Sequence, residues 1–258
     1  TPLYSSAASD VYKRQPRLYL DRPLAVGDTV ELDETAVRHG IQVLRLKPDD
    51  RLILFNGDGH DYLASLTVIA KKRATACIIQ AQAISNESPL YTHLALGIAK
   101  GERMDYALQK AVELGINRLT PLQTERCVVQ LDDKREQKRR QHWQGVIQGA
   151  CEQSGRARLP QLDSLILYSD FLASPLPGQR MILDPRSNQH LSQCSPPAKL
   201  ILMIGPEGGF SEAERELAYQ HDAIGVQLGP RILRTETAVV AGLTAAQTLW
   251  GDLDSTAC

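Results

Sequence analysis

The sequence lacks the marks of several large classes of protein. No stretch approaches 18 uninterrupted apolar residues, so no membrane-spanning helix is expected. Neither sign of charge dominates, because 29 Lys plus Arg stand against 30 Asp plus Glu. The bulk charge therefore neither favours nor excludes a nucleic-acid partner, which would have to meet a local basic patch. With 43% apolar and 23% charged residues, the 258-residue chain has the composition of a soluble globular protein.

Cysteine is scarce and shows no metal-binding or disulfide pattern. The chain has five cysteines, an odd number, and they are widely scattered without a CxxC pair: Cys77, Cys127, Cys151, Cys194 and Cys258. This spacing supports neither a zinc site nor a disulfide framework. We therefore expect reduced thiols, no metal site and a cytoplasmic location.

The usual signatures of phosphate-binding nucleotide sites are also missing. The chain has no loop ending in GK[ST], as in a P-loop, and no GxGxxG turn of the Rossmann type. It also lacks a recognisable nucleophile–base pair, so a phosphate-binding hydrolase is the weakest interpretation. The glycine-rich stretch MIGPEGGFSEAE at 203–214 nevertheless has the outline of a loop that holds a nucleotide.

The organisation of the chain suggests two domains of different type. Residues 1–15 lack usable periodicity, and we expect an extension outside the fold, disordered or artefactual. Residues 16–84 read as short strands with an NGDGH hairpin turn at 56–60 and one inserted helix over 35–46, which predicts a small β-barrel. After a polar break at 85–89, residues 90–253 alternate strands with helices, including two strand–turn–helix units from 181 and from 200. This pattern predicts a mostly parallel sheet covered on both faces.

Three loops of the second domain follow predicted strands, where open α/β sheets bind ligands. They are LDPRS from residue 183, IGPEGGF from residue 204 and LGPRILRTE from residue 228. Two of them contain Gly-Pro, which makes a rigid turn. Two related rigid turns at neighbouring strand ends favour one shared pocket.

The loop at 204–210 carries its own acid, which limits what it can hold. Ser211 and Glu214 have the spacing of a capping box, so the backbone donors of the next helix are expected to be engaged already. Glu207 would repel a phosphate as well. A hydroxyl-bearing, phosphate-free and cationic ligand such as S-adenosylmethionine fits this description. The plainer alternative is that Gly208 and Gly209 merely allow the chain to turn.

The last of the three loops places two arginines just before a helix whose predicted N-cap is Thr235. Arg231 and Arg234 flank two apolar residues, Ile232 and Leu233. One interpretation is that the apolar pair packs on a flat ring while an arginine holds a polar substrate group. The alternative, solvent-facing arginines with buried aliphatic side chains, is equally compatible with the spacing.

Five motifs, in this order along the chain, resemble the RsmE family of the SPOUT class. They are QKAVELG, TERCVV, CEQSGR, GPEGGFS and LGPRILRTETA, and the resemblance covers essentially residues 16–253. Members of this family methylate N3 of a uridine in 16S rRNA. The resemblance implies a PUA-like RNA-binding barrel over 16–84 and a methyltransferase domain with a C-terminal trefoil knot over 90–253. It also implies S-adenosylmethionine as methyl donor and a homodimer as the assembled form.

The resemblance also implies residue roles. The cofactor-binding residues would be Leu183, Gly205, Pro206, Gly208, Gly209, Leu228, Gly229, Ile232 and Leu233. In the barrel, the resemblance makes Arg17, Arg22, His39 and Arg45 candidates for RNA contact. Arg156 and Arg231 are further RNA-binding candidates, and the plainer alternative for Arg156 is a local ion pair with Glu152.

The chemistry of the reaction suggests two further roles. Uridine N3 carries a weakly acidic proton between two carbonyls, so methylation spreads negative charge onto O2 and O4. We hypothesise that Arg234, or less favourably Arg231, stabilises this charge, and that Glu207 accepts the proton. Two alternatives stay open: ribose 2′-hydroxyl methylation of RNA, and a non-catalytic RNA-binding module with a degenerate pocket.

Overall fold

The computed structural model describes residues 15–32, 34, 37, 45–70, 73–127 and 133–254, without the side chains of residues 133 and 134. The predicted extension at 1–15 lies almost wholly outside the described residues, as do most of the predicted helix at 35–46 and His39. The chain forms two compact units. The first contains the chain up to Asn86 together with Cys151–Leu159, and the second contains Glu87–Ala150 and the rest.

The first unit is built on a five-stranded sheet in the order β1-β3-β4-β5-β2. Its strands are β1 (Arg17–Tyr19), β2 (Thr29–Leu32), β3 (Arg51–Phe55), β4 (His60–Ala70) and β5 (Arg73–Ala83). Strand β1 pairs in parallel with β3, and the other pairs are antiparallel. The predicted turn at 56–60 is confirmed, because it joins the antiparallel strands β3 and β4.

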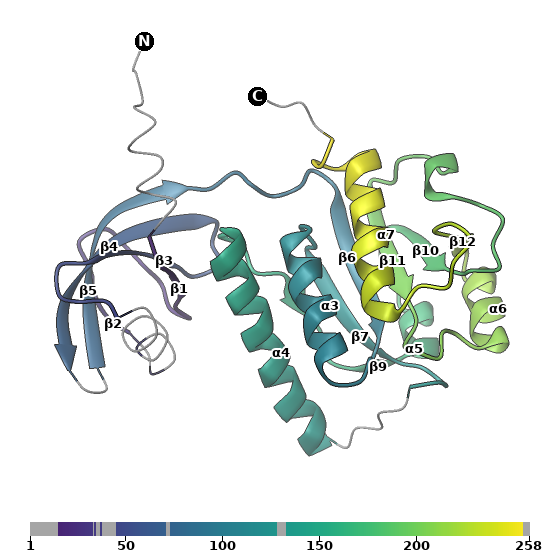
Figure 1. Cartoon of the computed structure of the whole chain (residues 1–258), viewed down its shortest axis with the longest axis horizontal. Coiled ribbons are helices and arrows are strands. Elements are labelled where there is room, and N and C mark those ends of the chain that lie inside the picture. The colour runs from purple at the N-terminus through teal and green to yellow at the C-terminus, as the bar shows by residue number, and fades with distance from the viewer. Residues whose placement is uncertain are drawn as a thin grey trace, which may run out of the picture. The chain divides into compact units, whose positions relative to one another are not determined.

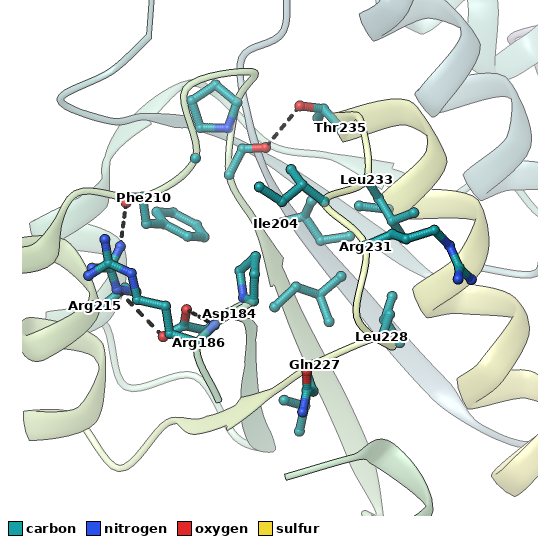
Figure 2. A pocket seen from close by; sticks show the side chains of 18 of the residues that line it. Asp184, Arg186, Ile204, Phe210, Arg215, Gln227, Leu228, Arg231, Leu233 and Thr235 are labelled. Carbon is teal, nitrogen blue, oxygen red and sulfur yellow. Dashed lines mark hydrogen bonds and ion pairs between the residues drawn. The ribbon is translucent and has the colours of Figure 1, made fainter. Parts of the chain in front are cut away.

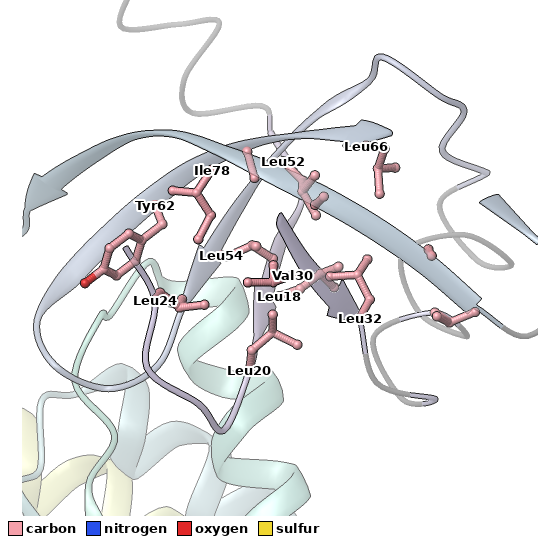
Figure 3. Close-up of a cluster of buried hydrophobic side chains, with 14 residues drawn as sticks. Leu18, Leu20, Leu24, Val30, Leu32, Leu52, Leu54, Tyr62, Leu66 and Ile78 are labelled. Carbon is pink, nitrogen blue, oxygen red and sulfur yellow. The ribbon is translucent and has the colours of Figure 1, made fainter. Parts of the chain in front are cut away.

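The core of this sheet follows from the alternation of side chains along its strands. Leu52 and Leu54 of β3 face the same cluster as Ala64 and Leu66 of β4, and all four are buried (Figure 3). The end of helix α4 (Asp133–Ser154) belongs to this unit as well, and the backbone N–H of Tyr19 donates to Glu152 Oε1 at 3.0 Å.

The second unit is a parallel sheet in the order β12-β10-β11-β6-β7-β8, with β9 also pairing with β7. The strands are β6 (Tyr91–Gly97), β7 (Arg118–Gln123), β8 (Gln161–Leu162), β9 (Ile166–Leu167), β10 (Gln179–Leu183), β11 (Lys199–Ile204) and β12 (Ile224–Val226). All of these pairs are parallel, as predicted. The carboxyl ends of β10, β11 and β12 therefore lie next to one another.

Helices cover both faces of this sheet. They are α3 (Glu102–Glu113), α4 (Asp133–Ser154), α5 (Tyr168–Ala173), α6 (Glu212–Gln220) and α7 (Thr235–Trp250). Helices α3 and α7 pack side by side, with α7 also against β11 (Figure 1). On the other face, α5 and α6 bury Phe171 and Ala218 against Ile201 and Met203 of β11. None of the helices in the described part of the chain has the length and hydrophobicity that crossing a membrane requires.

One predicted unit of the second domain is wrong. A helix was expected between the strand at 181 and the next strand, but only a short 3-10 helix, Leu191–Gln193, separates β10 from β11. Pro185, Pro196 and Pro197 lie in this connection. Because proline removes a backbone donor and clashes with the preceding turn, it leaves no room for a long helix there.

Candidate active site

The three loops after β10, β11 and β12 enclose one cavity of about 520 Å³. Each loop continues one of three neighbouring parallel strands, so their side chains converge beyond the same sheet edge. Asp184 and Arg215 lie on one side of the cavity, and Leu228 and Leu233 lie on the other (Figure 2). The expected single pocket is thus present at the expected edge of the sheet.

The cavity brings together most of the residues singled out from the sequence. All nine predicted cofactor-binding residues line it: Leu183, Gly205, Pro206, Gly208, Gly209, Leu228, Gly229, Ile232 and Leu233. Glu207 and Arg231 line it as well, whereas Arg234 is not among its lining residues. Their contacts with a ligand remain predictions, but the structure brings the two Gly-Pro loops and the loop after β10 together at one cavity.

The loop after β11 is a tight turn whose backbone faces the cavity. The N–H of Gly209 donates to the Pro206 carbonyl at 2.8 Å, and Gly209 has φ +63°, a conformation that favours glycine. A Cβ on Gly205 would lie 3.0 Å from the Gly209 carbonyl carbon and from the Phe210 nitrogen. A side chain at Gly205 would therefore push into the backbone of the turn itself.

The predicted capping box at the start of α6 is confirmed. The Glu214 N–H donates to the Ser211 hydroxyl at 3.2 Å, and the Ser211 N–H donates to the Glu214 carboxylate at 2.8 Å. The second oxygen of Glu214 also accepts the N–H of Glu125 at 2.8 Å. Ser211 and Glu214 thus fix the helix after the turn and attach it to the loop after β7.

Glu207 is held by the beginning of α3. Its Oε1 accepts the Lys100 N–H at 2.9 Å and lies 3.4 Å from an Arg103 guanidinium nitrogen. Burial raises the pKa of Glu207, but the backbone hydrogen bonds and the charge of Arg103 outweigh it and hold the pKa below its usual value. A carboxylate with a lowered pKa is a weaker base, so this geometry does not favour Glu207 as the proton acceptor.

Arg126 is a cavity residue that the sequence reasoning missed. Its guanidinium donates to the Gly208 carbonyl at 3.0 Å, and an added Cβ on Gly208 would lie 2.9 Å from the Arg126 Cβ. Arg126 belongs to the TERCVV motif, so the motif was noted but the arginine within it was not singled out. Only the folded chain brings residue 126 next to residue 208.

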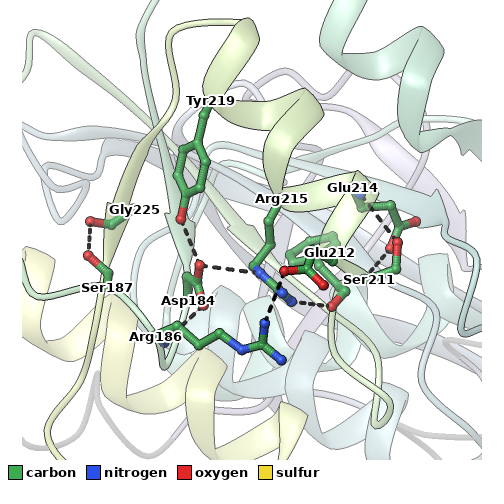
Figure 4. Close-up of polar contacts among 10 residues, drawn as sticks. Asp184, Arg186, Ser187, Ser211, Glu212, Glu214, Arg215, Tyr219 and Gly225 are labelled. Atoms are coloured by element: carbon green, nitrogen blue, oxygen red, sulfur yellow. Dashed lines mark hydrogen bonds and ion pairs between the residues drawn. The ribbon is translucent and has the colours of Figure 1, made fainter.

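A second missed group lies on the other side of the cavity (Figure 4). Asp184 is 4% exposed, accepts the Tyr219 hydroxyl at 2.7 Å and lies 3.5 Å from Arg215 Nε. Arg215 also donates to the Phe210 carbonyl at 2.8 Å. Burial, followed by the hydrogen bond to Asp184, raises the pKa of Tyr219 to about 12, so its hydroxyl remains a donor. This network fixes the loop after β10 to helix α6.

The start of α7 differs from the prediction. Arg234 rather than Thr235 occupies the N-cap, and Thr235 is the first helical residue. The Thr235 hydroxyl is turned back to the Gly205 carbonyl at 3.3 Å, so it joins two of the three loops instead of capping its helix. Arg231 and Arg234 are exposed, Ile232 is 88% exposed, and Leu233 is half-buried.

Two of the predicted RNA-binding arginines occupy structural positions in the first unit. Arg17 forms an ion pair with buried Asp61, lies 4.9 Å from the centre of the Phe55 ring and donates to the Arg156 carbonyl at 3.3 Å. Arg156 is 4% exposed. The ion pair and ring contact hold Arg17 within this unit, and burial leaves little of the Arg156 side chain for a partner.

The other predicted RNA-binding residues differ in exposure and location. Arg22 and Arg45 are exposed, and Arg231 lies at the cavity. His39 is outside the described residues. Among the side chains that the structure describes, no group of three or more His, Cys, Asp or Glu is placed to hold a metal ion.

Two family models match this chain, one in its N-terminal part and one over most of the rest. A family model described as an RNA methyltransferase domain matches residues 86–247, and one described as an RNA methyltransferase PUA domain matches residues 32–79. The ribosomal RNA small subunit methyltransferase E of Buchnera aphidicola subsp. Schizaphis graminum is 33% identical over 243 residues, which cover 93% of this chain and 99% of that protein. Its counterpart in Bacillus subtilis is 30% identical, covering 84% and 89%.

Solved structures show the same relationship. A ribosomal RNA small subunit methyltransferase E of Neisseria gonorrhoeae, crystallised with S-adenosyl methionine, is 42% identical with a TM-score of 0.87. A Legionella pneumophila protein described as a candidate methyltransferase, in complex with the same cofactor, is 38% identical with a TM-score of 0.91. Each match covers 93% of this chain and 100% of the other. The chain therefore belongs to the ribosomal RNA small subunit methyltransferase E family.

Proposed function

We propose that this protein transfers a methyl group from S-adenosylmethionine to N3 of a uridine in 16S rRNA. The observation that carries the proposal is the cavity beyond β10, β11 and β12, with its rigid Gly-Pro turns and bare backbone. The family membership supports the same activity, since its relatives are named as small-subunit rRNA methyltransferases.

The cavity fits the proposed cofactor in size and chemistry. Its volume of about 520 Å³ lies within the usual range for small-molecule sites, about 300–1,000 Å³. Backbone at Gly205 and Gly229 and apolar side chains at Leu228 and Leu233 suit a flat nucleoside without phosphates. When bound, S-adenosylmethionine supplies an electrophilic methyl group on its sulfonium. The nine predicted residues that line the cavity would hold it.

The arginines of the last loop are proposed to act on the substrate base. The enzyme must hold N3 in line with the methyl group and stabilise the charge that spreads onto O2 and O4. We assign this to Arg231 before Arg234, reversing the order expected from the sequence, because Arg231 lines the cavity and Arg234 does not. Since N3 is paired within a duplex, the target base must be unpaired or extruded.

The pair of arginines provides a matched test of this assignment. Replacing Arg231 with Ala is expected to lower kcat about 100-fold, the usual cost of losing one donor to a developing oxyanion. Arg234→Ala, three residues away with the same change in charge, is expected to lower it less. Methylation of small subunits lacking the modification measures both. If Arg234→Ala is instead the more impaired of the two variants, Arg234 rather than Arg231 is the main residue that stabilises the charge.

Three broader features belong to the same proposal. We propose a trefoil knot in the C-terminal segment; in its support, β12 lies at the sheet edge beside β10, yet α7 packs against β11 and α3. We also propose a homodimer, supported by the exposed apolar side chains of Leu249, in the last turn of α7, and Leu253, just after it. A cytoplasmic location follows from the proposed ribosomal substrate.

The first unit is proposed to bind RNA near the target nucleotide. Its matching family model is a PUA domain of RNA methyltransferases, and Arg22 and Arg45 present exposed guanidinium groups. Phosphate contacts from such residues position a nucleic acid without reading its sequence. We retain Arg22 and Arg45 as RNA contacts and withdraw Arg17 and Arg156.

The experiment that tests the function uses labelled S-adenosylmethionine and small ribosomal subunits that lack the modification. Nucleoside mass spectrometry of the product locates the methyl group. Label in 3-methyluridine supports the proposal, label in a 2′-O-methyl nucleoside supports the ribose methyltransferase, and absence of transfer with no binding heat for the donor supports the non-catalytic module.

A further inference from the structure

Three basic residues, from the start of α3 and from the loop after β7, contact the turn after β11 at two consecutive residues. Lys100 and Arg103, at the start of α3, contact the Glu207 carboxylate through the Lys100 N–H at 2.9 Å and the Arg103 guanidinium at 3.4 Å. Arg126, in the loop after β7, donates to the Gly208 carbonyl at 3.0 Å. We call Lys100, Arg103 and Arg126 the cationic lip.

The lip is exposed and groups three positively charged side chains. All three side chains are exposed, and Arg103 is 47% exposed. Against their three positive charges stand Glu207 in the turn and Glu102 and Asp105 in the first turn of α3, and Asp105 lies 2.8 Å from His142 Nε2. Arg126 uses one guanidinium nitrogen on the turn, which leaves further donors of its planar fork for a ligand. The Lys100 ammonium makes no hydrogen bond or ion pair with the described residues.

The position of the lip argues for a ligand outside the cofactor cavity. Arg126 lines the cavity, but Lys100 and Arg103 do not. Their charges are therefore placed beside the cavity, where a small molecule held within it would not reach them. A strand whose base enters the cavity carries phosphates on both sides of that base, and phosphates are bound by just such groups of Lys and Arg.

We propose that the cationic lip binds a backbone phosphate of the RNA strand next to the target nucleotide. The proposal rests on the proposed function, since it assumes an RNA whose base enters the cavity. Glu207 is a positioning residue here: by accepting the Lys100 N–H it ties the lip to the turn that forms one wall of the cavity. RNA bound at the lip is thus held at a fixed position relative to the cofactor cavity.

The double variant Lys100→Ala/Arg103→Ala tests the lip without opening the cavity. Alanine at residue 100 keeps the backbone N–H that binds Glu207, and Arg126 still holds Gly208. The KM for small subunits lacking the modification is expected to rise about tenfold, with kcat within about twofold. The slope of log kcat/KM against log salt concentration should become shallower by about 1, because a lost phosphate contact releases fewer counterions. The Kd for S-adenosylmethionine, measured by calorimetry, should change less than about twofold.

A control separates the lip from loss of positive charge in general. Lys138 is exposed on α4 and belongs to the same unit, so Lys138→Ala should leave KM and the salt slope unchanged within about twofold. An unchanged KM and salt slope in the double variant would overturn the proposal, and so would an equal effect in Lys138→Ala. A wild-type protein that binds no S-adenosylmethionine and transfers no methyl group would instead overturn the proposed function.

Discussion

Gly205 is a residue at which the cavity wall has no space for a side chain. An added Cβ would lie 3.0 Å from two backbone atoms of its own turn. Overpacking of this kind costs about 1–3 kcal/mol. Gly205→Ala is therefore expected to raise the Kd for S-adenosylmethionine about tenfold or more, measured by calorimetry. Gly149→Ala in α4, where a Cβ meets nothing within 4 Å, is the control and should bind normally.

His93 makes the stability of the second unit depend on pH. It is 2% exposed on β6 and lies 2.7 Å from the Thr120 hydroxyl. Burial, and then the charge of Arg118, lowers the pKa of His93 to about 4, with Asp163 opposing the shift. Between that value and the ordinary 6.5 of the unfolded chain, the unfolded state binds the extra proton. The stabilisation is thus fully present above pH 6.5 and is lost as pH falls toward 4.

Urea unfolding at two pH values measures this effect. From pH 7 to pH 5 the free energy of unfolding should fall by about 2 kcal/mol through His93. His93→Gln keeps a polar atom near Thr120 but does not titrate, so its stability should fall clearly less over the same range. Equal losses in the variant and the wild type would show that His93 is not the group responsible.

At the scale of elements, the capping box of α6 connects local sequence to the cavity. Ser211 satisfies a backbone donor at the helix start, and loss of such a cap costs about 1 kcal/mol. Ser211→Ala should lower the free energy of unfolding by about that amount in urea titrations. Ser211→Thr retains the hydroxyl and should recover most of the loss; a threonine variant as unstable as the alanine variant would argue against capping as the cause.

The elements that could be predicted are those with a strong local signal. The strand, turn and helix around MIGPEGGFSEAE follow from an apolar run, a Gly-Pro turn and a capping box, all within about twenty residues. Strands β8 and β9 have only two residues each, too short for a periodic pattern. Helix α5, with six residues, was missed for the same reason. The helix expected after β10 is absent because prolines interrupt the segment.

At the scale of the whole molecule, the sequence predicted the cavity but not the groups that hold it in place. Glycines and prolines after strands report their own backbone geometry, so a shared pocket at these loops could be predicted, while the nine lining residues were named from the family resemblance. The partners of that backbone are distant: Arg126 meets Gly208, and Arg215 meets Asp184. Such pairs depend on strand order, which the local pattern does not contain. The burial of Arg156 and the ion pair of Arg17 with Asp61 are likewise properties of the folded unit.

The proposed assembly is tested on the whole molecule. If the protein is a homodimer, light scattering coupled to size-exclusion chromatography should give twice the chain mass of 28.5 kDa. Replacing the exposed Leu249 and Leu253 with Glu should shift the mass toward that of one chain, because buried charge at an apolar interface is costly. A wild-type mass of 28.5 kDa at micromolar concentration would contradict the dimer.

The most direct measurement of the central claim is nucleoside mass spectrometry of 16S rRNA from unmodified small subunits incubated with the protein and S-adenosylmethionine. The account predicts one new methyl group per subunit, on N3 of uridine, and its loss in the Gly205→Ala variant at limiting donor. A methyl group on a ribose hydroxyl, or no methyl group from a protein that binds the donor, would contradict it.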